Sequence, residues 1–164
     1  EILMKDLLDA AKNASQKFVK KRILWVHTLP NWQNSMKMIF EASGRFELVG
    51  SDITFDSSVE INPDKPFESM AARIVYNTCN GGSEDRISAA AHYAKKLKAD
   101  GVIIFCHWGC KQTQGMSQQA KDFLEAEGFP TLILDGDGCD SRNVSDGQMT
   151  TRVVAFIEQL EGRK

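Results

Sequence analysis

The sequence predicts an α/β domain in three layers, a four-stranded parallel sheet with helices on both faces. Short, continuous apolar runs alternate with segments of helical periodicity, a pattern typical of parallel strands that are buried on both faces. The 164 residues, 42% of them hydrophobic, suffice for one domain, residues 1–164, with a sizeable core. Right-handed crossovers between such strands favour the order 2-1-3-4, which is flavodoxin-like.

The first part of the chain contains two predicted strands and the helix between them. Arg22–His27 is a short apolar run, and Phe46–Asp52 is the second strand. Between them, Pro30 precedes an apolar stripe at helical spacing that stops at Gly44. This stripe consists of Trp32, Met36, Ile39 and Phe40. A similar pattern predicts an amphipathic helix at the start of the chain, with Leu3, Leu7, Ala11, Ala14 and Phe18.

Two predicted helices follow the second strand. Pro66 suits the first position of a helix. The cluster Asn80–Ser83 ends that helix, and Ser83 is expected to cap the next one. Lysines near the end of the second helix suit its negative dipole end. The apolar residues are Phe67, Met70, Ala71, Ile74 and Val75 in the first helix, and Ile87, Ala90, Ala91, Ala94 and Leu97 in the second.

The last third of the chain supplies two more strands and two helices. Gly101–Cys106 is the third strand and Thr131–Asp135 the fourth. The helix between them is expected to begin near Gly115 and to end at Gly128. Its apolar residues are Met116, Ala120, Phe123 and Leu124, and those of the last helix are Met149, Val153, Phe156, Ile157 and Leu160.

Composition and charge narrow the functional classes. The net charge of −2 comes from interspersed residues, so neither nucleic acid nor a membrane surface is suggested as a partner. No apolar run has the length of a membrane span or a signal peptide, and we expect a cytoplasmic protein. Four cysteines without paired C-x-x-C spacing indicate neither a disulfide framework nor a structural zinc site. Phosphate-binding glycine loops of the common types are absent from the sequence.

The segment Asp100–Lys111 carries the strongest chemical signal, because an apolar strand runs directly into two thiols, a histidine and a tryptophan. In an open α/β sheet, ligands bind beyond the carboxyl ends of the strands, at the point where strand order reverses. The loop His27–Asn31 should therefore face Cys106–Cys110, with Asp135–Asp140 along the same crevice.

The cysteines differ in what they are expected to do. Cys106 ends a buried strand, where a thiol commonly acts as a small hydrophobic group. Cys110 lies beyond the strand, near a helix start and Lys111, which favours a thiolate for nucleophilic or metal-binding use, although a structural role is equally compatible. Cys139 is expected to be a turn residue, and Cys79 to lie at a remote edge.

The histidines and aspartates leave alternatives open. His107 can ligate a metal, donate a proton, bond to a substrate or merely cap backbone groups, and His27 shares this ambiguity. Asp135, Asp137 and Asp140 suggest a magnesium or calcium site only weakly, since aspartates in such turns commonly bond to their own backbone.

Several stretches together resemble the C-terminal part of the 2-hydroxyacyl-CoA dehydratase and benzoyl-CoA reductase family. They run from Asp100 through Cys110 and the Leu134–Gly138 turn to Gln148–Arg152 and Ala155–Glu158. The chain begins at Glu1 without a methionine, and we expect it to be the C-terminal fragment of a longer subunit.

The resemblance implies an iron-sulfur enzyme in which Cys110 is one of three cysteine ligands of an oxygen-sensitive cluster, of the [4Fe-4S] type. The other two ligands are implied to lie upstream, so the fragment alone should hold no intact cluster and show no activity. His107 is then a candidate catalytic residue, and Trp108 a cofactor-binding residue beside the sulfurs.

The implied reaction is the radical dehydration of a 2-hydroxyacyl-CoA to an enoyl-CoA, by way of a ketyl radical. The implied partners are the acyl-CoA substrate, a homologous subunit in a dimer, and an ATP-dependent activator protein that donates the electron. Alternatives are a related ATP-activated reductase of the benzoyl-CoA reductase or double-cubane type, or a flavodoxin-like module that binds acyl-CoA or a partner. A thiol enzyme with Cys110 as nucleophile and His107 as base is a third alternative.

Overall fold

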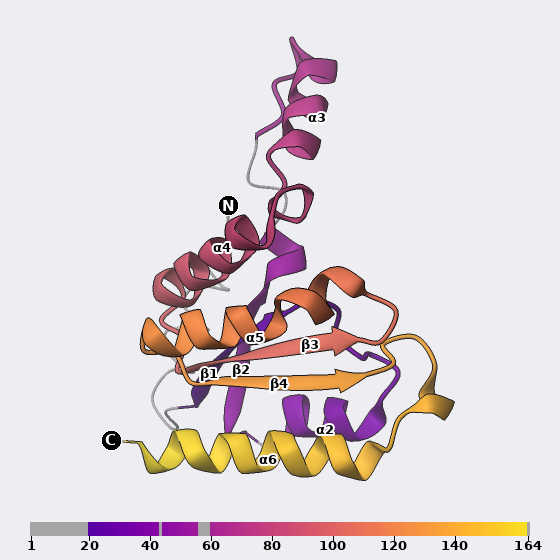
Figure 1. The fold of residues 1–164 in the computed structure, drawn as a ribbon, viewed down its shortest axis with the longest axis vertical. Coiled ribbons are helices and arrows are strands. Elements are labelled where there is room, and N and C mark those ends of the chain that lie inside the picture. The colour runs from indigo at the N-terminus through magenta and orange to yellow at the C-terminus, as the bar shows by residue number, and fades with distance from the viewer. Residues whose placement is uncertain (1–19, 43, 56–59, 164) are drawn as a thin grey trace, which may run out of the picture.

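The four apolar runs form a single parallel sheet. The structure is a computed structural model that describes residues 20–42, 44–55 and 60–163. The strands are β1 (Lys21–Val26), β2 (Phe46–Ser51), β3 (Gly101–His107) and β4 (Thr131–Gly136). All neighbouring strands pair in parallel, in the order β2-β1-β3-β4 (Figure 1). The predicted fold class and strand order are therefore confirmed.

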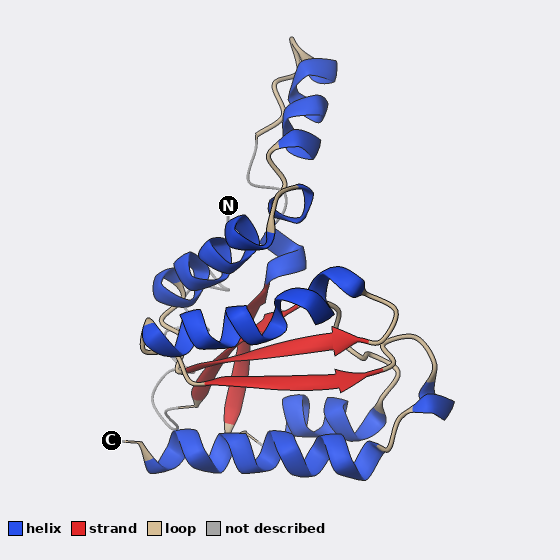
Figure 2. Ribbon diagram, in the orientation of Figure 1, coloured by secondary structure: helices blue, strands red, loops and turns tan. Residues whose placement is uncertain are grey.

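Two apolar layers hold helices against the two faces of the sheet. Alternate strand residues point to opposite faces. Ile23 and Trp25 therefore pack with α2 (Asn34–Ala42) and α6 (Asp146–Gly162). Leu24 and Val26 pack instead with α4 (Ser83–Lys96) and α5 (Lys111–Ala126). Figure 2 shows these helix pairs on either side of the strands.

The helix α3 (Pro66–Val75) departs from the expected pattern, because it projects away from the sheet (Figure 1). Its apolar side chains are exposed, with 84% of Phe67 and 68% of Ile74 accessible. Two helices already cover each face of the sheet, and four strands about 5 Å apart leave little width for a third. The apolar stripe of α3 is therefore not part of the core.

Element boundaries differ from the prediction at two helix starts. The helix α5 begins at Lys111 rather than near Gly115, which makes Cys110 its N-cap residue. Ser83 is the first residue of α4 and not its cap, because the Asp85 side chain accepts a hydrogen bond from the Gly82 amide instead. The amphipathic pattern in residues 1–18 lies outside the described residues. Within the described ranges, no helix has the length and apolarity needed to cross a membrane.

Candidate functional site

The carboxyl ends of the strands bring the predicted site residues together. The Gly138 amide, beyond β4, donates a 3.0 Å hydrogen bond to Nδ1 of His107, at the end of β3. A Cβ atom on Gly138 would lie 3.2 Å from Thr28 Oγ1, beyond β1. The loops after β1, β3 and β4 thus meet at one edge, as the sequence predicts.

His27 makes the turn at the end of β1. Its φ of +79° is a left-handed conformation that few residues other than glycine adopt. The turn directs its backbone amide to Asp52 Oδ1, 2.6 Å away, while its ring nitrogen Nδ1 lies 2.9 Å from Thr28 Oγ1. Burial and the positive charge of Arg86 lower the pKa of His27, and Asp52 opposes them only in part.

We expect the variant His27→Asn to weaken the loss of stability in acid. Because the folded-state pKa of His27 lies below the ordinary value of about 6.5, the unfolded chain binds more protons as the pH falls below that value. The unfolding free energy of the wild type therefore falls there. Asparagine cannot titrate and tolerates a positive φ.

Urea unfolding at several pH values measures this effect. The unfolding free energy of the wild type minus that of His27→Asn should be constant above about pH 7 and should decrease below about pH 6.5. Parallel curves over the whole range would show that His27 does not contribute to the acid sensitivity.

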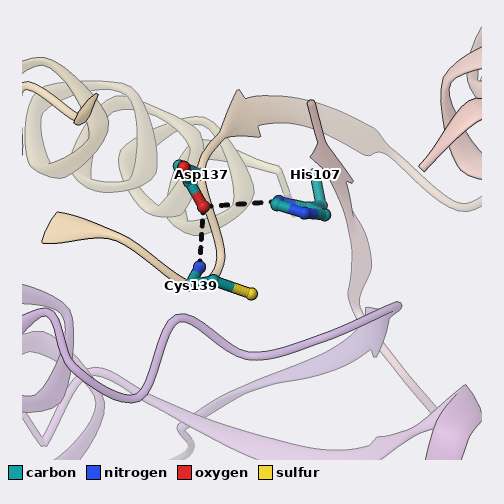
Figure 3. Close-up of side chains that lie close together, drawn as sticks. All are labelled: His107, Asp137 and Cys139. Carbon is teal, nitrogen blue, oxygen red and sulfur yellow. Dashed lines mark hydrogen bonds and ion pairs between the residues drawn. The ribbon is translucent and has the colours of Figure 1, made fainter. Parts of the chain in front are cut away.

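His107, Asp137 and Cys139 form a compact group at the same edge (Figure 3). Each can offer a metal-binding atom, and these atoms lie within 4.8 Å of one another. Imidazole, carboxylate and thiolate are the ligand types that suit zinc or iron. However, His107 Nδ1 and the Asp137 carboxylate already accept hydrogen bonds from backbone amides of the turn after β4.

The carboxylate of Asp137 organises the turn after β4. Its Oδ1 accepts hydrogen bonds from the amides of Cys139 and Asp140, and its Oδ2 accepts one from Asn143. The Asn143 and Cys139 bonds lower the pKa of Asp137. Asp140 likewise accepts from the Arg142 amide. Both aspartates therefore stabilise turns, which was the favoured alternative to a magnesium or calcium site.

The side chain of His107 bonds to the turn after β4 and not to the Cys110 thiol. Its Nδ1 accepts from Gly138, so the neutral ring carries its proton on Nε2. A Cβ atom on Gly109 would lie 3.0 Å from Nε2, so a larger residue there would require the His107 ring to shift. Among the described contacts, the His107 side chain makes no hydrogen bond to the Cys110 thiol. This geometry does not support a nucleophilic Cys110 with His107 as its base.

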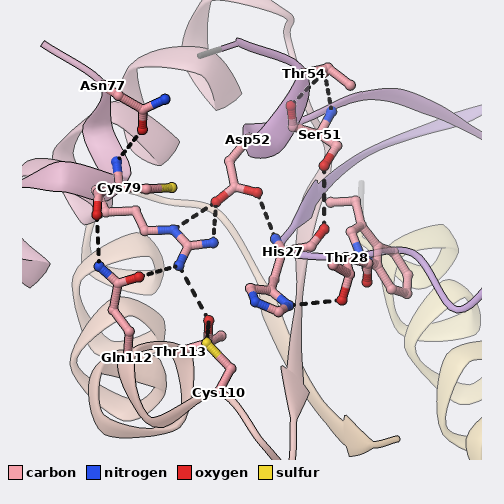
Figure 4. A network of polar contacts seen from close by, with 12 residues as sticks. His27, Thr28, Ser51, Asp52, Thr54, Asn77, Cys79, Cys110, Gln112 and Thr113 are labelled. Atoms are coloured by element: carbon pink, nitrogen blue, oxygen red, sulfur yellow. Dashed lines mark hydrogen bonds and ion pairs between the residues drawn. The ribbon is translucent and has the colours of Figure 1, made fainter. Parts of the chain in front are cut away.

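Cys110 is the half-buried N-cap residue of α5, and its backbone amide bonds to the His107 carbonyl at 2.9 Å. Its Sγ lies 3.3 Å from the Thr113 hydroxyl (Figure 4). Burial raises the pKa of Cys110, but hydrogen bonds from Thr113 and from the Gln112 amide, helped by the charge of Arg86, lower it on balance. The surroundings of Cys110 therefore favour the thiolate more than those of an ordinary cysteine do.

The environment of Cys106 shifts the pKa of its thiol in the opposite direction. It is 1% exposed within the apolar layer beneath α5, as predicted. Burial raises the pKa of its thiol. Of the two thiols in this segment, Cys110 is therefore the one suited to bind a metal.

A buried ion pair behind Cys110 was not predicted from the sequence. The guanidinium of Arg86, on α4, donates from both Nε and Nη2 to Asp52 Oδ2, at 2.8 and 2.7 Å. The two side chains are 2% and 5% exposed. Two signals in the sequence could have revealed the pair. Arg86 lies four residues before Ala90 on the apolar stripe, and Asp52 follows a strand directly.

Cys79 does not lie at a remote edge, which corrects the prediction. It lies in the short helix η2 (Thr78–Asn80), and its carbonyl accepts a 3.2 Å hydrogen bond from the Gln112 side chain, two residues from Cys110 (Figure 4). Its side chain is exposed. The segment that links α3 to α4 therefore reaches the edge that carries Cys110.

Trp108 lines a separate polar pocket of about 240 Å³ beside the start of α6. The indole is 52% exposed, and Gln148 and Arg152 line the same pocket. Arg152 is held there by Asp135 and by the Ile133 carbonyl. About half of the Trp108 indole surface therefore stays accessible at this pocket.

Comparisons with known proteins agree on one family. A family model described as 2-hydroxyglutaryl-CoA dehydratase, D-component, matches residues 1–160. The alpha subunit of lactoyl-CoA dehydratase from Anaerotignum propionicum is 28% identical over 114 residues, covering 67% of this chain and 25% of that protein. The alpha subunit of (R)-2-hydroxyglutaryl-CoA dehydratase from Acidaminococcus fermentans is 37% identical over 65 residues, covering 39% and 14%.

A beta subunit is similar over more of the chain. The (R)-phenyllactyl-CoA dehydratase beta subunit of Clostridium sporogenes is 26% identical over 166 residues, covering 96% of this chain and 43% of that protein. The chain therefore spans less than half of the length of each of these relatives.

Proposed function

The chain belongs to the 2-hydroxyglutaryl-CoA dehydratase D-component family, and we propose that it is the C-terminal domain of an iron-sulfur 2-hydroxyacyl-CoA dehydratase subunit. In this proposal Cys110 is one cysteine ligand of the cluster, and upstream parts of the subunit supply the others. The observation that carries the proposal is the half-buried Cys110 thiol, which hydrogen bonds favour as a thiolate at the ligand-binding edge of the sheet.

The chemistry of Cys110 fits an iron-sulfur cluster. Thiolates are the usual protein ligands of such clusters. Cys110 offers one, with the N-terminal end of α5 and Arg86 stabilising its negative charge. A cluster bound there would supply low-potential electron transfer and a Lewis-acidic iron for the substrate hydroxyl.

Other residues of the edge have supporting roles in the proposal. His107 presents an Nε2 proton from a ring whose other nitrogen is fixed by Gly138, so it can donate a hydrogen bond to a substrate oxygen or a cluster sulfur. Trp108 offers an apolar face that can exclude water from the reacting acyl group.

The proposed substrate is the CoA thioester of a 2-hydroxy acid, which loses water to give the enoyl-CoA. The substrates named for the three relatives, lactoyl-CoA, 2-hydroxyglutaryl-CoA and phenyllactyl-CoA, are all of this class. The relatives are alpha or beta subunits, which supports a homologous subunit as partner. We include an ATP-dependent activator protein in the proposal as the electron donor.

An anaerobic assay tests the proposed function. The complete subunit, with its partner and activator, is incubated with ATP, a reductant and a 2-hydroxyacyl-CoA, and the product is identified by mass spectrometry. We expect the loss of one water molecule. The matching saturated acyl-CoA serves as control and should remain unchanged. An unsaturated acyl-CoA is tested in a parallel sample. Its reduction, with no dehydration of the 2-hydroxyacyl-CoA, would instead identify a related reductase.

A further inference from the structure

Thr113 connects the buried ion pair to the Cys110 thiol. The third guanidinium nitrogen of Arg86, Nη1, donates a 3.2 Å hydrogen bond to Thr113 Oγ1. Thr113 is fully buried, and its hydroxyl lies 3.3 Å from Cys110 Sγ. The contacts form one chain, from Asp52 through Arg86 and Thr113 to the sulfur. Figure 4 labels Asp52 at one end of this chain, and Thr113 and Cys110 at the other.

The direction of the last hydrogen bond follows from donor chemistry. Arginine is only a donor, so the Thr113 oxygen accepts from Arg86 and its own proton is free for another partner. A thiolate has no proton to give. When Cys110 is a thiolate, the Thr113 hydroxyl must therefore donate to its sulfur.

Hydrogen bonds to Asp52 fix the orientation of the Arg86 guanidinium, so that its Nη1 stays directed at Thr113. Both Nε and Nη2 bind Asp52, whose other oxygen accepts the amide of His27. Three elements of the fold, namely the end of β1, η1 (Asp52–Phe55) and α4, thus fix the guanidinium plane. The hydroxyl of Thr113 is fixed in turn.

We propose that Thr113 is a positioning residue that donates a hydrogen bond to the ligating sulfur of Cys110 and thereby raises the reduction potential of the cluster. The inference rests on the proposed function, because it assumes that Cys110 binds iron. A hydrogen bond to a ligating sulfur draws negative charge away from the iron, which stabilises the reduced cluster. Arg86 strengthens the bond by polarising the Thr113 hydroxyl.

Three variants of the complete subunit test this role. Thr113→Val replaces the hydroxyl by a methyl group of similar size, and Thr113→Ala removes it without any crowding. Thr113→Ser keeps the hydroxyl and is the matched control. The midpoint potential of the cluster is measured by a redox titration monitored by electron paramagnetic resonance, and the iron content is measured in the same samples.

We expect Thr113→Val and Thr113→Ala to shift the midpoint to a more negative potential, while Thr113→Ser keeps the wild-type value. Loss of iron from both, with unchanged circular dichroism and full loading of Thr113→Ser, would also support the role. Iron-loaded Val and Ala variants with the wild-type potential would overturn this inference but not the proposed function. A wild-type subunit without iron would overturn both.

Discussion

The variant Cys110→Ser should lower the dehydration rate of the complete subunit by more than about 100-fold. Loss of a residue that merely supports a metal ligand typically costs about 10- to 100-fold, and removal of the ligand itself should cost more. A serine hydroxyl is a far weaker ligand for iron than a thiolate, because it keeps its proton at neutral pH. The measurement is the initial rate in the anaerobic assay described above.

Cys79→Ser is the matched control for this prediction. It makes the same replacement at an exposed cysteine of the same edge, where only the backbone carbonyl takes part in the described contacts with α5. We expect its rate to stay within about twofold of wild type, since exposed substitutions seldom change stability by more than about 0.5 kcal/mol. An active Cys110→Ser enzyme would refute the assignment of Cys110.

The variant Asp52→Asn should destabilise the domain by about 3–5 kcal/mol, because it leaves the charge of Arg86 buried without a counter-charge. The amide has nearly the same shape as the carboxylate, so the change isolates charge from packing. Chemical denaturation gives the unfolding free energy.

A partly exposed ion pair provides the comparison. Glu47 binds Arg22 at the opposite end of the sheet, with both side chains more than 40% exposed. Glu47→Gln should cost less than about 1 kcal/mol. Equal decreases in unfolding free energy in Asp52→Asn and Glu47→Gln would show that burial does not make the Asp52–Arg86 pair more important for stability. Replacing both partners by apolar residues, Asp52→Leu with Arg86→Met, should recover much of the loss.

The sheet was predictable because its strands are buried on both faces and therefore carry continuous apolar runs. Strand order followed from the handedness of the crossovers. The position of α3 was not predictable from periodicity, because an apolar stripe is the same whether it meets the sheet or something outside this domain. The start of α5 differs from the prediction because a glycine at position 115 indicates a boundary by pattern, whereas the helix already begins at Lys111.

The candidate site was predictable where reactive side chains directly follow a strand. His27, His107, Cys110 and the Asp137 turn all meet at the carboxyl edge, as parallel strands require. Arg86 lies on α4, and only the three-dimensional packing brings it to Thr113. Thr113 itself reaches Cys110 within one helical turn, because α5 begins at Lys111 rather than near Gly115. The approach of Cys79 to the same edge depends on the path of the chain after α3, which the sequence pattern does not specify.

The assignment of Cys110 as an iron ligand is tested by measuring iron and acid-labile sulfide per subunit in anaerobically purified wild type and Cys110→Ser. We expect a near-stoichiometric iron-sulfur cluster in the complete wild-type subunit and little or none in Cys110→Ser, with both proteins folded as judged by circular dichroism. A fully loaded Cys110→Ser subunit would contradict the assignment of Cys110 as a ligand. A folded wild type that never acquires iron would contradict the proposed function as a whole.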